Sequence, residues 1–207
     1  MRVARLLPAL FLLALCLPSP ALARALPAAA SIGNSGEIAE GSGSQAVDLA
    51  AQVVPPSALG PHWVAINQSG AGSTEALQLF AVTYQNDIEY PAPRLASFTL
   101  VTTSLVPVQV VMDGMRTAAE ASGAVLAPYR GLGDGAAFRG IVPAESGAGG
   151  IIYIFRIGNV VATVGAGSLD QPDGKGEPGS GLDPALLAEL DAQALEFARL
   201  QESLLRQ

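Results

Sequence analysis

Cysteine and histidine are almost absent from this sequence, and their scarcity limits the chemistry that the chain can perform. Cys16 is the only cysteine and His62 the only histidine among 207 residues. A single histidine excludes a zinc site built from several histidines, and a single cysteine excludes an internal disulfide. A metal bound by this chain would therefore need oxygen ligands.

Charged residues are also few, at 14% of the chain, and those present are mainly acidic, with a formal net charge of −7. The acids are scattered, and lysine and arginine form no cluster. Binding to a nucleic-acid backbone requires clustered basic residues, and attraction to anionic membranes requires positive charge. We therefore expect no nucleic-acid partner.

The N-terminus has the features of a secretory signal peptide over residues 1–23. Arg2 and Arg5 precede an apolar run over residues 6–17, and the small residues Ala21 and Ala23 suit a signal peptidase. The run is shorter than the roughly 20 residues that span a membrane. We predict cleavage after Ala23, a secreted or periplasmic location, and no transmembrane anchor after cleavage. Loss of two arginines and no acid would change the net charge from −7 to −9.

Cys16 supports an alternative, because residues 13–16 (Leu-Ala-Leu-Cys) resemble a bacterial lipobox. The chain would then be lipid-anchored through Cys16. Leu15 departs from the small residue usual before that cysteine, so cleavage after Ala23 is favoured. In that case the mature chain contains no cysteine and is held together by packing alone.

Residues 24–45 are rich in Ala, Gly, Ser and Pro, and large apolar residues such as Ile32 and Ile38 are isolated. Such a composition cannot bury enough surface to fold, so we predict a flexible linker. Residues 46–207 are long enough for a single domain with one core. We expect it to start with a short helix over residues 47–53 that ends before Pro55 and Pro56.

Runs rich in β-branched and aromatic residues predict a series of strands. The clearest is a hairpin, with strands over residues 151–157 and 160–164 joined by Gly158 and Asn159. Glycine supplies the positive φ that a two-residue hairpin turn requires, and the apolar character of both faces predicts a central pair. Further strands are expected over residues 63–66, 77–84, 95–103, 125–129 and 137–142, with a turn at residues 70–73.

Two segments have helical periodicity. The first follows Pro107 and ends near Gly123, and the second opens with Asp183 as cap and Pro184 in the first turn. The sequence therefore predicts an α+β fold, in which an antiparallel sheet is packed by a central helix and a C-terminal helix. The apolar stripe expected on the second helix comprises Leu186, Leu190, Ala194, Phe197, Leu200 and Leu204.

Three features resemble functional motifs. Residues 131–136 match the dinucleotide pattern in letters, but a strand rather than a helix is expected after them, so we predict a plain turn. Asp170, Asp173, Glu177 and Asp183 lie in a Gly-rich loop, where solvated acids are favoured although calcium binding stays open. For His62 we favour a structural or surface role over membership of a catalytic triad.

Arg139 and Arg156 lie within predicted strands, and several polar and aromatic residues are expected near them. One interpretation is that Arg139 and Arg156 pair locally or extend to water, and the other is that these residues line a shallow pocket between helix and sheet. No catalytic residue, metal ligand or cofactor is predicted. The candidate ligand-binding residues are Trp63, Tyr129, Arg130, Asp134, Arg139, Tyr153 and Arg156.

Three short motifs carry a resemblance to known proteins: residues 61–63 (Pro-His-Trp), 131–134 (Gly-Leu-Gly-Asp) and 155–161 (Phe-Arg-Ile-Gly-Asn-Val-Val). The arrangement resembles secreted bacterial proteins with extracytoplasmic sensor-like domains, related to the sensor domains of receptor kinases. The similarity would cover about residues 46–205. It implies an extracytoplasmic location and a sensor-like fold.

These observations favour a noncatalytic extracytoplasmic domain that binds a small ligand, an envelope component or a protein. The alternative is a secreted accessory or assembly factor that acts through protein contacts, and a hydrolase using His62 or loop carboxylates ranks third. A pocket lined by Arg139, Arg156 and Tyr153 would favour ligand binding. An exposed apolar patch on a helix or a strand edge would favour protein contacts.

Overall fold

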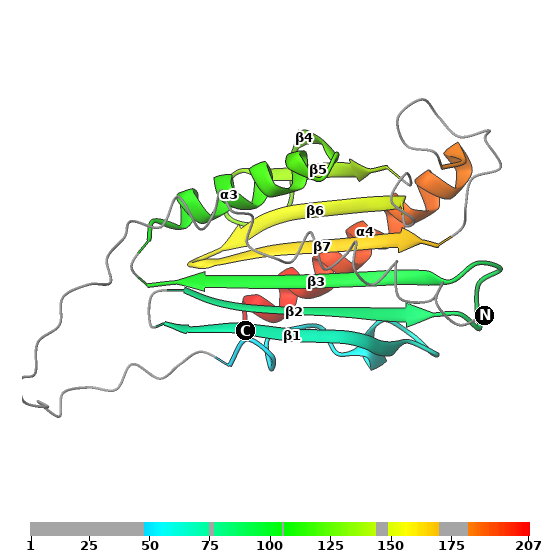
Figure 1. The fold of residues 1–207 in the computed structure, drawn as a ribbon, viewed down its shortest axis with the longest axis horizontal. Helices are drawn as coiled ribbons and strands as arrows, with labels where there is room; N and C mark the ends of the chain where they lie inside the picture. Colours follow the sequence, from blue (N-terminus) through cyan, green and yellow to red (C-terminus); the bar gives the residue numbers. More distant parts are fainter. Residues whose placement is uncertain (1–47, 75–76, 105, 144–148, 170–181) are drawn as a thin grey trace, which may run out of the picture.

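The computed structural model describes residues 48–74, 77–104, 106–143, 149–169 and 182–207. Within these ranges the chain forms one seven-stranded antiparallel sheet in the order β1-β2-β3-β7-β6-β5-β4 (Figure 1). The predicted signal peptide, linker and acidic-loop residues Asp170, Asp173 and Glu177 lie outside the described residues. The strands are β1 Val64–Thr74, β2 Leu77–Asn86, β3 Arg94–Thr103, β4 Val125–Tyr129, β5 Ala137–Val142, β6 Gly149–Ile157 and β7 Val160–Ser168.

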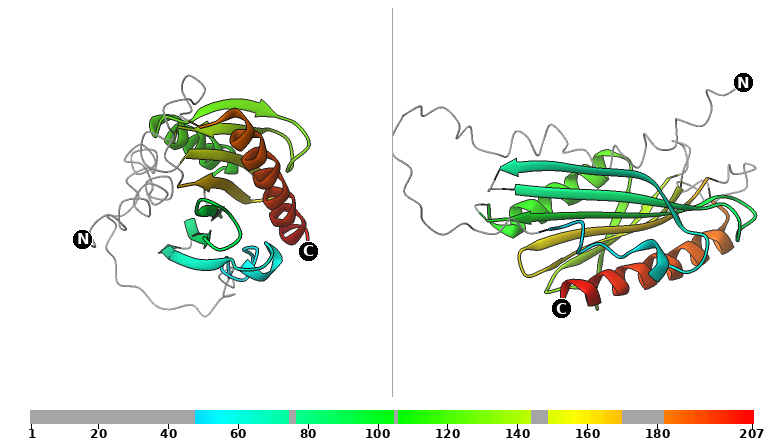
Figure 2. Two further views of the ribbon diagram at one scale, coloured as in Figure 1. Left: turned by 90° about the vertical axis from the view of Figure 1, so that its right-hand side faces the viewer. Right: turned by 90° about the horizontal axis from the view of Figure 1, so that it is seen from below.

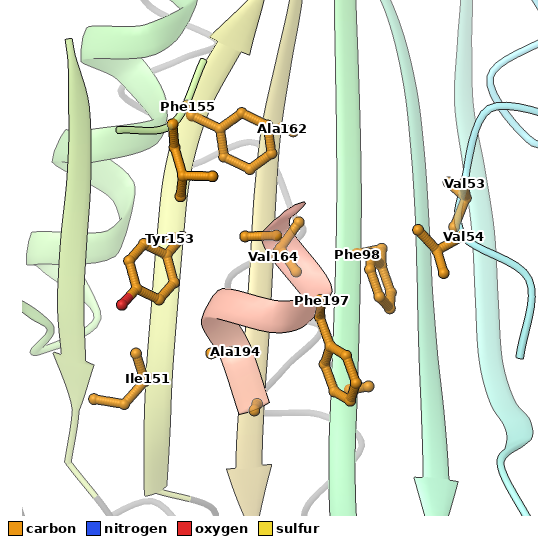
Figure 3. Close-up of a cluster of buried hydrophobic side chains, with 14 of the residues drawn as sticks. Val53, Val54, Phe98, Ile151, Tyr153, Phe155, Ala162, Val164, Ala194 and Phe197 are labelled. Atoms are coloured by element: carbon orange, nitrogen blue, oxygen red, sulfur yellow. The ribbon is translucent and has the colours of Figure 1, made fainter. Parts of the chain in front are cut away.

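Two helices cover opposite faces of the sheet, as the two views in Figure 2 show: α3, Val108–Ala121, and α4, Pro184–Leu205. The predicted α+β architecture, with an antiparallel sheet packed by a central and a C-terminal helix, is therefore confirmed. Strand alternation divides the apolar side chains between the two faces. The core under α4 includes Phe98, Phe155, Val164 and Phe197, part of the cluster in Figure 3, whereas Val101, Ile154 and Val161 belong to a second cluster with α3.

The predicted hairpin lies at the centre of the sheet. β7 pairs with β3 on one side and with β6 on the other. Its apolar side chains pack in the core under α4 on one face and in the core under α3 on the other. Gly158 has a φ of 57°, the left-handed conformation expected at the turn. Asp183 caps α4 as predicted, since its Oδ1 accepts hydrogen bonds from the backbone N–H groups of Ala185 and Leu186 at 2.8 and 3.3 Å.

The sequence predictions were wrong in two places near the N-terminus. Residues 49–52 form a turn rather than a helix, because Val53 and Val54 pack into the core under α4 and Gln201 hydrogen-bonds the backbone of residues 52 and 54. A short 3-10 helix, η1 at Pro56–Ala58, follows.

The second difference concerns the turn predicted at residues 70–73. These residues instead continue β1, which pairs with β2 as far as Thr74 opposite Leu77. Gly70 fits the strand because it lies opposite Phe80, where the sheet provides backbone pairing that outweighs the turn preference of glycine.

Candidate functional site

Two of the predicted site residues, Arg139 and Tyr153, lie together under α4. Arg139 in β5 is paired with Tyr153 in β6, so both side chains leave the sheet on the same face. Both side chains donate to Oδ1 of Asp191 in α4, Arg139 through its Nε at 2.8 Å and Tyr153 through its hydroxyl at 2.8 Å. Tyr129 packs edge-on against Tyr153 with ring centroids 5.0 Å apart.

This cluster of Arg139, Tyr153 and Asp191 couples α4 electrostatically to the sheet. Burial raises the pKa of Tyr153, and the hydrogen bond to Asp191 raises it further, so the phenol stays protonated and keeps donating. The hydrogen bond to Asp191 also raises the pKa of Arg139. Both donors are directed at Asp191. Arg139 is therefore paired locally, which is one of the interpretations that the sequence left open.

Arg156 lies on the other face of the sheet. It is paired with Val161, whose side chain packs with α3, and it is an odd number of residues from Tyr153 along β6. The structure therefore does not bring Arg156 together with Arg139 and Tyr153. Instead Arg156 is near the turn at residues 131–135, where its carbonyl accepts from the backbone N–H of Asp134 at 2.7 Å.

Asp134 joins three elements at one end of the sheet. Its Oδ2 accepts from the backbone N–H of Gly158 in the β6–β7 turn at 2.8 Å, and its Oδ1 accepts from Arg206 at 3.0 Å. Arg206 also pairs with Glu202 at 2.8 Å, and Glu202 accepts from the backbone N–H of Gly133 at 3.1 Å. The Gly-rich segment at residues 131–135 is thus a turn that leads into β5, as predicted. Its Gly133 and Asp134 are hydrogen-bonded to Glu202 and Arg206 at the end of α4.

The contacts of Asp134 predict an acid-dependent contribution to stability. The Gly158 N–H, followed by Arg206, lowers the pKa of Asp134 below its ordinary value of 3.8. As the pH falls, the Asp134 carboxylate of the unfolded chain therefore binds a proton before that of the folded chain does. The stability that Asp134 contributes at neutral pH is lost as the pH falls through the folded-state pKa. We expect Asp134→Asn to be less stable than the parent at pH 7, with the difference shrinking below about pH 4. Urea unfolding at pH 7 and pH 3 measures both, and a pH-independent difference would contradict the assignment.

The remaining predicted residues do not join either cluster. Trp63 is a buried core residue whose ring meets Phe197 edge-on at 5.6 Å. Arg130 is exposed at the end of β4. His62 is exposed with a φ of 65° immediately before Trp63, a position at the surface entrance to β1.

Sequence reasoning missed the contributions of α4 and of Arg94. Asp191, Glu202 and Arg206 lie on the helix flanks, where charged residues ordinarily face water, so helical periodicity alone did not distinguish them. Arg94 is buried against α4, pairs with Glu189 at 2.9 Å and lies over the ring of Tyr90. Its Nε and second terminal nitrogen have no hydrogen-bond partner among the described residues. In the sequence Arg94 stands between Pro93 and the strand predicted at residues 95–103, a position that gave no indication that its side chain is buried.

The edge strand β1 carries exposed apolar side chains near its start. Val64 and Ile66 are 56% and 44% exposed, and Ile88 in the β2–β3 loop is 70% exposed. Asp87 and Glu89 flank Ile88 and are exposed. The Asn86 amide donates to the Pro61 carbonyl at 3.0 Å, so this loop starts beside the segment that enters β1. We call Val64, Ile66, Asp87, Ile88 and Glu89 the edge patch.

The described part of the chain shows neither a metal-binding cluster nor a membrane-spanning helix. No group of three or more His, Cys, Asp or Glu residues there is arranged to hold a metal ion. None of the helices described combines the length and apolar character needed to cross a membrane. No protein-family model, curated protein or solved structure matches the chain.

Proposed function

We propose that this chain is a noncatalytic extracytoplasmic binding domain whose ligand is a protein. The observation that carries the proposal is the exposure of Val64 and Ile66 on an edge strand, with the exposed Ile88 in the loop at the same end of the sheet. Apolar side chains grouped at a surface are typical of interaction sites. The location follows from the predicted signal peptide at residues 1–23.

The arrangement of the polar candidates favours a protein over a small ligand. A pocket for a small ligand needs convergent polar groups that are available to it. Here Arg139 and Tyr153 both donate to Asp191, and Arg156 lies on the opposite face. The edge patch instead offers apolar side chains and acids at the surface.

Site-specific photo-crosslinking in the producing cell tests this function. A photoreactive residue in place of Ile66 is expected to give a covalent adduct with another protein. The same residue in place of Val125, which is 67% exposed on the opposite edge strand β4, is the matched control. Adducts of equal yield at both positions, or at neither, would contradict the proposal.

Native mass spectrometry of the purified protein gives an independent check. The mass of a chain that begins at Arg24 is expected from cleavage after Ala23, whereas a lipidated Cys16 would establish the lipid-anchored alternative. A stoichiometric small molecule retained by the chain would favour the small-ligand alternative over a protein partner.

A further inference from the structure

We infer that β1 binds an extended, positively charged segment of a partner protein, which adds to the sheet as an eighth strand. The inference rests on the proposed function and names the partner's chemistry. It requires three things of the site: an open strand edge, apolar contacts for side chains, and a charge that selects the partner.

The first requirement is met by the pairing of β1. Among the described strands it is hydrogen-bonded only to β2, and it forms one edge of the sheet (Figure 1). Residues 67–71 pair one to one with residues 83–79 of β2, so this stretch is a regular strand. An edge strand presents unpaired N–H and C=O groups, which a second extended chain can bind.

β1 also lacks most of the features that prevent pairing. Its sequence, Val64–Thr74, contains no charged residue and no proline. A β-bulge between Ala65 and Asn67 leaves Ile66 outside the regular register, which confines the ladder available to a partner to the residues after it. The opposite edge, β4, includes Pro128, which has no N–H to donate.

The second requirement is met by the exposed apolar side chains of the edge patch. Val64 and Ile66 lie at the start of β1, and Ile88 belongs to the loop that begins beside that start. A partner strand that runs past residues 67–71 would reach Val64 and Ile66 at one end, and Ile88 lies in the loop at that same end of the sheet. Apolar residues alternating along the partner would find contacts there.

Charge selects the kind of partner. Asp87 and Glu89 are exposed in the edge patch, and the chain as a whole has a net charge of −7. A second copy of this chain would bring the same negative charge to the interface, whereas a lysine- or arginine-rich segment would be attracted to it. The complementary occupant is therefore a basic extended segment.

Three capped nine-residue peptides provide the probes. The first alternates lysine and valine, the second replaces each lysine with glutamate, and the third has the basic sequence with every backbone nitrogen methylated. Fluorescence polarisation with the secreted chain measures affinity, and amide chemical shifts locate the site. We expect the basic peptide to bind about tenfold more tightly than the acidic one at low salt. The methylated peptide should not bind, because it cannot form the ladder.

Matched variants test the residues. Val64→Thr and Ile66→Thr keep the preference for a strand while removing apolar contact, and each is expected to weaken binding about threefold to fivefold. Val125→Thr makes the same change to an exposed valine of β4 and should leave binding unchanged. Circular dichroism establishes that all three variants fold.

Several results would overturn the inference. These are absence of binding by the basic peptide, equal binding of the acidic or methylated peptide, or shifts centred away from β1. A symmetric dimer that Val64→Thr dissociates would identify a second copy as the occupant instead. If Ile66 still forms crosslinks to a protein in cells while the basic peptide does not bind, the proposed function stands and this inference fails.

Discussion

Replacing Gln201 with leucine is expected to lower the free energy of unfolding by about 2–4 kcal/mol. Gln201 of α4 is fully buried, its Oε1 accepts from the backbone N–H of Val54 at 3.1 Å, and its Nε2 donates to the carbonyl of Gln52 at 2.6 Å. Leucine fills a similar volume but leaves both backbone groups without a partner. A buried backbone group without a hydrogen bond costs about 1–3 kcal/mol.

Gln193→Leu is the matched control on the same helix. Gln193 is half-buried and donates to the Tyr90 hydroxyl at 3.1 Å, so water can replace the lost donor. We expect a loss below about 1 kcal/mol. Urea unfolding monitored by the fluorescence of Trp63, which contacts the same helix, measures both variants. Equal losses would show that the contacts of Gln201 with residues 52 and 54 contribute little.

Gly150→Ala is expected to be at least as damaging and to prevent the start of β6 from pairing normally with β7. A methyl group at this position would overlap the carbonyl oxygen of Ala166 and lie 2.8 Å from the Cα of Gly167. These are backbone atoms of the central strand, so they cannot rotate away as a side chain would. Overpacking typically costs about 1–3 kcal/mol where side chains can adjust, and we expect a loss at the upper end of that range or above it.

Gly70→Ala provides the control for this change. An added methyl group there meets only the Phe80 ring, at 4.0 Å, which is an ordinary contact. Alanine is also less costly than glycine to order in a strand, so a gain of about 0.5 kcal/mol is expected. Thermal unfolding followed by circular dichroism compares the two variants, and a similar fall in Tm for both would contradict the steric explanation.

Local signals in the sequence predicted most of the architecture. The hairpin around Gly158, the helix after Pro107 and the cap at Asp183 each combine a hydrophobic period with a residue suited to one backbone conformation. The turn predicted at residues 70–73 depended on one kind of signal, and that prediction was wrong. The glycines at residues 70 and 72 indicated a turn, but pairing with β2 extends the strand through them. This outcome depends on β2, which a local pattern cannot reveal.

The sequence was less informative about the polar clusters. It grouped Arg139, Tyr153 and Arg156 on the expectation that their strands pair, and of these three the structure brings only Arg139 and Tyr153 together. It could not identify Asp191 as their acceptor, since that contact spans 38 residues from Tyr153 and depends on how α4 crosses the sheet. The separation of Arg156 from this cluster follows from strand alternation once the boundaries of β6 are known.

The packing of α4 has a consequence for the timing of folding. This helix is the last described element in the chain, yet it covers the central strands and, through Gln201, also secures residues 52 and 54 near the beginning of the domain. A growing chain therefore exposes Phe98, Phe155 and Val164 until residues 184–205 have been synthesised. Folding is expected to be delayed until synthesis of the domain is nearly complete, so the nascent polypeptide remains dependent on protection from aggregation until then.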